Sequence, residues 1–143
     1  MKISTRGRYA LRFMFYMASH VKDGFTALKD VSEYENISLK YLEQIASLLS
    51  KAGLLISVRG PQGGYKLAKA PSHYTALDII RVTEGSLTPV AEVAGDELTE
   101  SQGIINEVLW KGLKNAVDAF LGSVTLEDLV NKKNTMENFI YMI

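Results

Sequence analysis

The sequence predicts a mainly α-helical fold with one small β-hairpin. Two long stretches, residues 4–22 and 104–124, repeat their apolar residues with the period of an amphipathic helix. Residues 54–67 instead alternate with a period of two around a glycine-rich turn. The 143 residues are 47% hydrophobic and 22% charged, which is the composition of a globular protein able to bury an ordinary core.

The first predicted helix covers residues 4–22, with Ser4 or Thr5 as its N-cap. Its expected buried face consists of Ala10, Phe13, Met14, Met17 and Val21. Leu11 and Phe15 are apolar too, but they lie on a different side of the helix. This second side needs a second partner, either another subunit or the C-terminal helix. The alternative is that this helix is the central element of a single core.

Residues 27–34 predict a short second helix, capped by Thr26, whose inward residues are Leu28 and Val31. A tight turn follows, and Ser38 is expected to cap a third helix. Two short helices joined by so few residues form a candidate helix-turn-helix.

The third helix has an apolar stripe and an opposite polar stripe. The apolar stripe, which anchors it to the core, contains Leu42, Ile45, Ala46 and Leu49. The polar stripe contains Lys40, Gln44, Ser47 and Lys51, with Tyr41 and Glu43 on its flanks. Such side chains can bind base edges and phosphates in the major groove of DNA, although any solvated helix face has a similar composition.

After the helix-ending Gly53, residues 54–59 are expected to form a half-buried strand with Leu54, Ile56 and Val58 on one face. The turn from Gly60 to Gly64 contains Pro61, and either Gly63 or Gly64 can adopt a positive φ. A tip with so few side chains can approach a sugar-phosphate backbone, with Arg59 and Lys66 supplying positive charge. An ordinary tight hairpin is the alternative. In this order, the helices and the hairpin predict a winged helix-turn-helix.

The second half begins with a helix at residues 76–84. Thr75 and Asp78 form a capping box at its start, and Gly85 ends it. Residues 87–103 are expected to form a loop. Residues 104–124 follow as the longest helix, and Thr125 with Asp128 caps a short helix that ends near Lys133. The apolar C-terminal residues 139–143 are expected to be docked rather than free.

The longest helix has an unusually broad apolar face. It comprises Ile105, Leu109, Leu113, Ala116 and Phe120, with Val108, Val117 and Leu121 on a neighbouring row. A stripe of this width predicts that the helix pairs with its copy in a dimer. The chain therefore divides into a winged helix-turn-helix domain, residues 1–84, and a part comprising a regulatory loop, the dimerisation helix and the C-terminal tail, residues 85–143.

The net charge is zero, but the two halves differ. Residues 1–70 contain 11 lysines and arginines against 5 acidic residues, a net charge of +6, whereas residues 71–143 contain 5 against 11, a net charge of −6. A basic half can attract a polyanion such as duplex DNA through counterion release.

Several classes of function are excluded or disfavoured. The absence of cysteine excludes disulfides, zinc-finger clusters and thiolate-bound iron-sulfur clusters, so we expect no metal and no cofactor. His20 and His73 have no nucleophile or second carboxylate at a useful spacing, and we expect neither catalytic residues nor enzymatic activity. No apolar run is long enough to span a membrane, which makes the cytoplasm the expected location.

Four segments together resemble the Rrf family of bacterial winged-helix transcription regulators, of the IscR, NsrR and CymR type. They are residues 1–11, residues 38–45, the run of residues 52–65 that includes the glycine turn, and residues 78–85. The resemblance covers nearly the whole chain. It implies a homodimer that binds a palindromic operator in double-stranded DNA.

The resemblance also implies which residues contact DNA. Ser38, Lys40, Tyr41 and Gln44 match the family's recognition helix, and Arg59 with Gly60 to Gly64 matches its wing. Lys2, Ser4 and Arg8 match its N-terminal segment near the DNA backbone. Glu43 matches an acidic position that can influence which operators are accepted.

The cluster-binding members of the family carry three cysteines in the segment that corresponds to residues 87–103, and this sequence has none. It is most similar to the cysteine-free, CymR-like repressors. That likeness implies control of sulfur and cysteine metabolism, with cysteine synthase as a partner. Two other interpretations remain open: a protein-interaction module that docks a metabolic enzyme, and a regulator that senses a small molecule between the fourth helix and the dimerisation helix.

Overall fold

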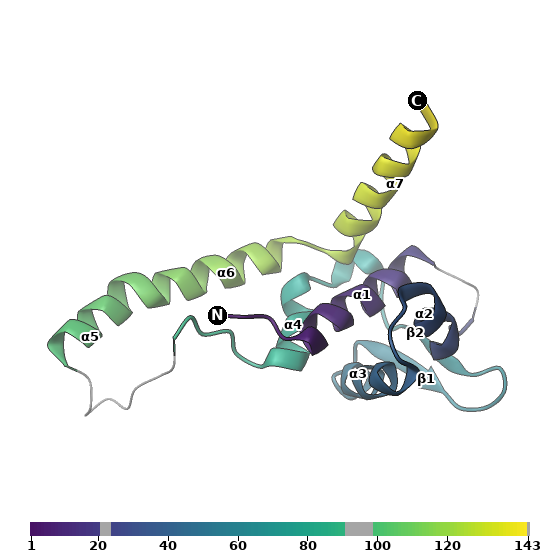
Figure 1. Ribbon diagram of the computed structural model, residues 1–143, viewed down its shortest axis with the longest axis horizontal. Helices are drawn as coiled ribbons and strands as arrows, with labels where there is room; N and C mark the ends of the chain where they lie inside the picture. Colours follow the sequence, from purple (N-terminus) through teal and green to yellow (C-terminus); the bar gives the residue numbers. More distant parts are fainter. Residues whose placement is uncertain (21–23, 91–98, 143) are drawn as a thin grey trace.

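The computed structural model describes residues 1–20, 24–90 and 99–142. A compact lobe contains α1 (Thr5–Ser19), α2 (Leu28–Glu35), α3 (Leu39–Lys51), the strands β1 (Leu55–Val58) and β2 (Gly64–Leu67), and α4 (Ala76–Glu84), with a 3₁₀ turn η1 (Pro71–His73) before α4. Two helical arms leave this lobe in different directions (Figure 1). One consists of α5 (Glu100–Ile105), the π-helical turn η3 (Asn106–Trp110) and α6 (Lys111–Ser123), and the other is α7 (Leu126–Met142). The predicted winged helix-turn-helix with a small hairpin is confirmed.

Polar caps fix most of the helix boundaries where the sequence predicts them. The Ser4 hydroxyl accepts a hydrogen bond from the Gly7 amide, and the Ser38 hydroxyl accepts one from the Tyr41 amide. The predicted capping box of α4 is present, since Thr75 and Asp78 each bond the other's backbone amide. Helix α1 ends at Ser19, and the predicted contribution of Val21 lies outside the described residues.

The core forms where α1, α3, α4 and the start of α7 meet. Its fully buried side chains include Phe13, Met14, Leu42, Ile45, Leu49, Tyr74, Ile79 and Leu126. The predicted apolar faces of the first and third helices are therefore confirmed for all their described members. Leu126 belongs to the second half of the sequence, so the start of α7 completes the core of the N-terminal lobe.

Thr26 does not cap the second helix, contrary to the prediction. Ala27 is the N-cap of α2 and provides no side-chain hydrogen bond. The backbone of Thr26 instead pairs with that of Tyr65 in β2, through N···O distances of 2.7 and 2.8 Å. Threonine suits both a cap and an extended segment, and here the extended backbone acquires a partner that is distant in the sequence.

The strand of residues 54–59 is shorter and more exposed than predicted. Leu54 and Leu55 are both buried at the base of the hairpin, whereas Ile56 and Val58 remain 42% and 46% exposed. The two strands pair with each other along Leu55↔Leu67 to Val58↔Gly64, and the bridge of Tyr65 to Thr26 adds a single residue to this sheet. A two-stranded hairpin that extends from the lobe has no second layer to cover these apolar residues, so the period of two does not become a buried face.

The last two helices of the chain are longer than predicted, whereas α4 has its predicted bounds. The long helix begins at Glu100 rather than residue 104, because Thr99 and Gln102 form a capping box. Part of the predicted loop, residues 91–98, lies outside the described residues. Thr125 and Asp128 cap α7 as predicted, but α7 continues to Met142 instead of ending near Lys133.

The expectation of a docked C-terminus is wrong for the single chain, at least for the side chains that the structure describes. Met136, Phe139 and Ile140 on α7 are 55%, 64% and 68% exposed. The described helices include none that is long and apolar enough to cross a membrane.

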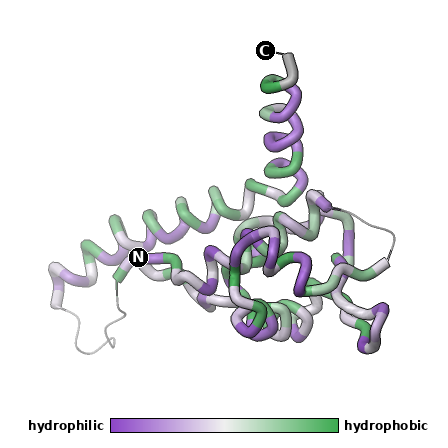
Figure 2. Tube along the Cα trace, turned by 45° about the vertical axis from the view of Figure 1, so that its right-hand side comes forward, coloured by the Kyte–Doolittle hydropathy of each residue, from purple (hydrophilic) through white to green (hydrophobic). Residues whose placement is uncertain are grey.

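The long helix keeps its predicted apolar face open to solvent. Ile105, Leu109, Leu113, Ala116 and Phe120 are all exposed, and Phe120 is 67% exposed. Figure 2 shows apolar and polar segments alternating along α5, α6 and α7. On the second side of α1, Leu11 and Phe15 are half-buried, and α1 contacts α7. Of the two alternative partners, the C-terminal helix is thus in contact with α1 within the single chain.

Candidate nucleic-acid interface

Helix α3 presents the predicted polar stripe to solvent. The four apolar residues of the opposite stripe are completely buried and fix the rotation of the helix about its axis. Lys40, Gln44, Ser47 and Lys51 are consequently exposed, and so are Ser38 and Glu43. Lysine, glutamine and serine on one exposed stripe can supply hydrogen bonds to bases or phosphates.

Tyr41 differs from its neighbours on α3 because it is half-buried. Its ring meets the ring of Tyr9 edge to face, with 5.6 Å between the centroids. The guanidinium of Arg12 lies 5.3 Å from the Tyr9 ring and forms an ion pair of 3.1 Å with Glu35. Tyr41 therefore connects the polar stripe to α1 directly, and to α2 through Arg12 and Glu35.

The glycine turn is attached to the lobe by the pairing of Tyr65 with Thr26. A Cβ atom on Gly64 would lie 2.3 Å from the Thr26 carbonyl oxygen, and Gly64 has a φ of +145°. A Cβ atom on Gly63 would lie 2.1 Å from the Val58 carbonyl oxygen. Only glycine fits at these two positions, so the turn is tightly specified. Of the two alternatives in the sequence, Gly64 adopts the positive φ.

A buried tyrosine fixes the base of the hairpin. The Tyr74 hydroxyl donates a hydrogen bond to the Leu54 carbonyl at 2.7 Å and accepts bonds from the amides of Ala68 and Lys69 at 2.8 and 3.1 Å. Burial raises the pKa of this hydroxyl, and the two backbone donors oppose the rise without cancelling it. Sequence reasoning missed Tyr74, because nothing local indicates that its hydroxyl meets both ends of the hairpin.

The hairpin carries its predicted charges on the outside. Arg59, Gly60 and Pro61 are exposed at the tip, and Lys66 is exposed on β2. The Lys66 ammonium lies 5.1 Å from the centre of the Phe25 ring, which holds the ammonium beside the segment in which Thr26 pairs with Tyr65. Lys40, Lys51, Arg59 and Lys66 take part in no ion pair within the described residues.

The predicted DNA-contacting residues of the N-terminal segment, Lys2, Ser4 and Arg8, differ in how they contact the rest of the protein. Lys2 and Arg8 are exposed, and the Arg8 guanidinium donates a hydrogen bond only to the nearby Thr5 hydroxyl within the described residues. Ser4 is engaged, because its hydroxyl caps α1 and also donates to the Glu84 carboxylate at the end of α4. The structure therefore gives Ser4 a positioning role. Its partner Glu84 was not identified from the sequence.

The structure brings the polar stripe of α3 and the hairpin together. They follow each other in the chain, contact each other through α3 and β1, and lie on the part of the lobe away from the α5–α6 arm (Figure 1). The described residues contain no group of three histidine, cysteine, aspartate or glutamate side chains that could hold a metal ion. What this surface can offer a partner is hydrogen bonds and positive charge.

Comparisons with known proteins agree with this geometry. A model of the family described as "Rrf2: Iron-dependent Transcriptional regulator" matches residues 3–132. The HTH-type transcriptional regulator CymR of Bacillus subtilis is 44% identical over 131 residues, which are 92% of this chain and 91% of that protein. IscR of Photorhabdus laumondii is 36% identical over 137 residues, which are 96% and 84% of the two chains.

Solved structures show the same fold. The structure of CymR, described as the global cysteine regulator of B. subtilis, superposes with a TM-score of 0.78 at 45% identity and covers 92% of this chain and 98% of that chain. The structure of T. potens IscR superposes with a TM-score of 0.73 at 38% identity, covering 93% and 88%.

Proposed function

This chain belongs to the Rrf2 family of transcriptional regulators, and from this membership we propose that it is a homodimer that binds a palindromic DNA operator. The observation that carries the proposal is the fixed placement of two DNA-compatible elements. The exposed polar stripe of α3 lies beside a hairpin whose base is held by Tyr74 and whose turn is held by Thr26. Two elements fixed relative to each other can engage a groove and a neighbouring backbone at once.

In this proposal α3 enters the major groove. Gln44 reads an adenine, and Lys40 and Lys51 bind guanine or phosphate. Ser38, Tyr41 and Ser47 add polar contacts, while Glu43 favours operators that offer a donor and disfavours those that bring a phosphate close. The surface that reads DNA is assigned to residues 1–84, and control and dimerisation are assigned to residues 85–143.

The hairpin and the N-terminal segment bind the backbone. Arg59 and Lys66 approach phosphates or a narrow minor groove, and Gly60, Pro61, Gly63 and Gly64 allow the tip to come close. Lys2 and Arg8 contact phosphates near the start of α1, which Ser4 holds in place. Each neutralised phosphate adds a salt-sensitive contribution that is independent of sequence.

The dimer forms through the apolar face of the long helix. Exposed side chains on α5, η3 and α6, among them Val108 at 77% and Leu109 at 52%, leave an apolar surface that one chain does not cover. Pairing with the same face of a second copy would bury it and relate two α3 helices by a twofold axis. A palindromic operator matches that symmetry.

We further propose that the protein represses genes of sulfur or cysteine metabolism and that cysteine synthase is its partner. The support is its similarity to CymR of B. subtilis, whose structure is described as that of a global cysteine regulator. The family description mentions iron, but an iron-sulfur cluster does not fit this chain, because the sequence contains no cysteine to provide thiolate ligands. A switch without a cluster is accordingly part of the proposal.

Selection of bound DNA from a random pool tests this function, with and without purified cysteine synthase. We expect recovery of one palindrome, and we expect the enzyme to change the yield of bound DNA. Recovery of unrelated sequences would contradict specific binding, whereas a yield that the enzyme leaves unchanged would contradict only the partnership.

A further inference from the structure

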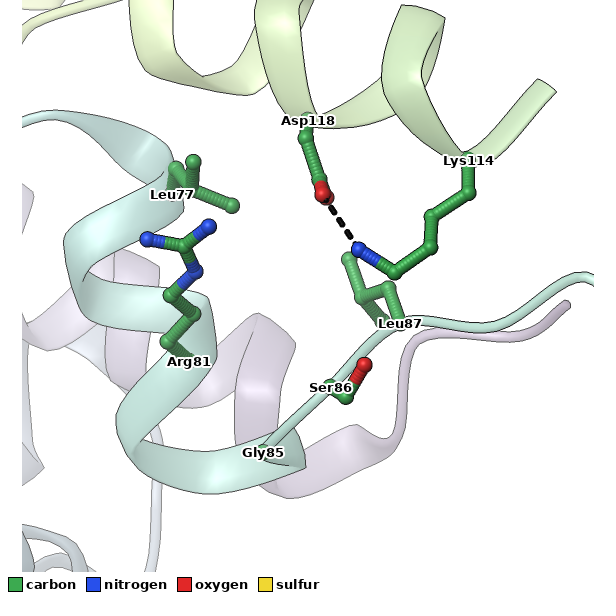
Figure 3. A pocket seen from close by; sticks show the side chains of 7 residues that line it. All are labelled: Leu77, Arg81, Gly85, Ser86, Leu87, Lys114 and Asp118. Carbon is green, nitrogen blue, oxygen red and sulfur yellow. Dashed lines mark hydrogen bonds and ion pairs between the residues drawn. The ribbon is translucent and has the colours of Figure 1, made fainter. Parts of the chain in front are cut away.

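A small hollow lies between α4 and α6, away from the surface assigned to DNA. It is open to solvent on one side, has a volume of about 280 Å³ and is lined by Leu77, Arg81, Gly85, Ser86, Leu87, Lys114 and Asp118. Figure 3 shows Arg81 reaching from α4 on one side and the Lys114–Asp118 pair descending from α6 on the other. Its volume lies just below the range of roughly 300–1,000 Å³ typical of ligand pockets, so it suits a small metabolite.

The charges of the hollow favour an anion. Lys114 and Asp118 neutralise each other through an ion pair of 2.7 Å. The guanidinium of Arg81 has no carboxylate partner among the described residues. One arginine without a counter-ion remains, and its planar group matches a carboxylate through two parallel hydrogen bonds.

The other residues that line the hollow indicate what the ligand carries besides its carboxylate. Leu87 is only 6% exposed, and with Leu77 it gives the hollow apolar walls. Such walls accept a short aliphatic chain, while the Lys114–Asp118 pair and the Ser86 hydroxyl can meet a polar end. We propose that this hollow binds a small metabolite with one carboxylate, and that its occupancy changes the DNA affinity, a regulatory role that rests on the proposed function.

A short route connects the hollow to the N-terminal segment of the DNA surface. Residues 83 and 84 follow Arg81 by less than one turn of α4. The Thr83 carbonyl accepts a hydrogen bond of 2.9 Å from the Arg6 guanidinium, and the Glu84 carboxylate accepts one of 2.9 Å from the Ser4 amide. A ligand that pulls on Arg81 therefore acts on the helix end that positions Lys2 and Arg8. The C-terminal end of α4 can couple the hollow to the N-terminal segment if the ligand binds one position of this helix end more tightly than another.

Binding is tested first without DNA, by titrating the full chain with sodium butyrate and recording ¹H–¹⁵N spectra. We expect saturable shifts of the Gly85 amide and of the Arg81 Nε–H signal. 1-Butanol has the same chain length without the carboxylate, and sodium phosphate is an anion without the chain; we expect neither to reproduce these shifts. An equal response to either probe, or no saturable response to butyrate, would overturn the carboxylate site.

Two variants remove the site in different ways. Arg81→Gln deletes the charge, and Ser86→Leu fills the hollow from an exposed position. We expect each to weaken butyrate binding by at least about tenfold, because the charge-assisted hydrogen bonds or the space are lost. Arg59→Gln is the matched control, since it removes an arginine from the hairpin and should bind butyrate like the unchanged protein. Butyrate binding that survives both Arg81→Gln and Ser86→Leu would refute the site.

The regulatory part is tested with the selected operator at constant ionic strength. We expect saturating butyrate to change the operator affinity at least about fivefold, the lower end of typical allosteric coupling, and to have no effect on Arg81→Gln. Saturable binding of butyrate without any change in operator affinity would overturn the regulatory role. Butyrate binding by a protein that selects no DNA would keep the pocket and contradict the proposed function, so the two failures are distinguishable.

Discussion

The hydroxyl of Tyr74 donates a hydrogen bond to the carbonyl of Leu54 across the base of the hairpin, at 2.7 Å. Leu54 lies just before β1, and the amides that donate to the same hydroxyl, those of Ala68 and Lys69, lie just after β2. One completely buried side chain thus holds the entry and the exit of the wing. We expect this contact to hold the hairpin in its place beside α3.

The Tyr74→Phe variant should lose about 1–3 kcal/mol of unfolding free energy, because the buried Leu54 carbonyl and the part-buried amides of Ala68 and Lys69 lose their shared partner. Chemical denaturation at neutral pH measures the loss. Leu42→Ile is a control for a volume-conserving change in the same core, and a smaller cost is expected from it. A cost for Tyr74→Phe below that of the control would contradict the anchoring role.

Alkaline pH should reduce the difference in free energy of unfolding between the unsubstituted protein and Tyr74→Phe. Burial raises the pKa of Tyr74 above its ordinary value of 10.0, so the folded state retains this proton more strongly than the unfolded state. The contribution is complete below about pH 10 and declines as the pH rises through the folded-state pKa. Tyr16, whose pKa burial also raises, is common to both proteins and cancels from the difference. Denaturation from pH 8 to 11 measures the trend, and a difference that grows with pH would be inconsistent with it.

A Gly64→Ala substitution should weaken operator binding more than Gly60→Ala does. Both glycines have a positive φ, which costs alanine about 1 kcal/mol or more, but only at Gly64 would the new methyl group collide with the Thr26 carbonyl. A Cβ atom on Gly60 has nothing within 4 Å. Operator titrations of both variants provide the comparison, and equal losses would show that the Thr26 contact does not position the wing.

Gln44→Ala should relax the base preference at one operator position. A good bidentate contact discriminates between bases by about 1–3 kcal/mol, whereas binding to unrelated DNA depends on phosphates and should change little. Titrations with the four base variants at each half-site position measure the preference. Unchanged selectivity at every position would refute the role assigned to Gln44.

Leu113→Asp should dissociate the dimer, because it places a charge in the apolar face of the long helix. Sedimentation should show an increase of the dimer dissociation constant by more than about tenfold. Asn115→Asp adds the same charge at another exposed position of α6 and should leave the dimer intact. A Leu113→Asp protein that remains dimeric would place the dimer contact elsewhere.

Local signals made much of the fold predictable. Thr75 and Asp78 mark the observed start of α4 and Gly85 its end, and the period of apolar residues identifies the buried face of α3. Thr99 and Gln102 offered the same kind of signal for the start of α5, but Gly103 and the polar surroundings obscured it. The full length of α7 was not predictable from a buried stripe, because its last apolar residues are exposed in the single chain.

The site was predictable where exposure follows from helical periodicity and was not where it depends on distant contacts. The polar stripe of α3 follows directly from the burial of its apolar stripe. By contrast, the pairing of Thr26 with Tyr65, the engagement of Ser4 by Glu84 and the anchoring of the hairpin by Tyr74 join residues that only the tertiary structure brings together. The periodicity of a sequence does not tell which residues far apart in the chain will contact each other.

The affinity for the selected palindrome and for a scrambled duplex, measured against salt concentration, tests whether the α3 stripe and the wing bind a specific DNA sequence. We predict a linear fall of log affinity with log salt, a palindrome bound at least about 10³-fold more tightly than the scrambled duplex, and a slope that Arg59→Ala reduces by about one for each wing. Equal affinity for the two duplexes, or an affinity that does not depend on salt, would contradict sequence-specific binding of DNA by the α3 stripe and the wing.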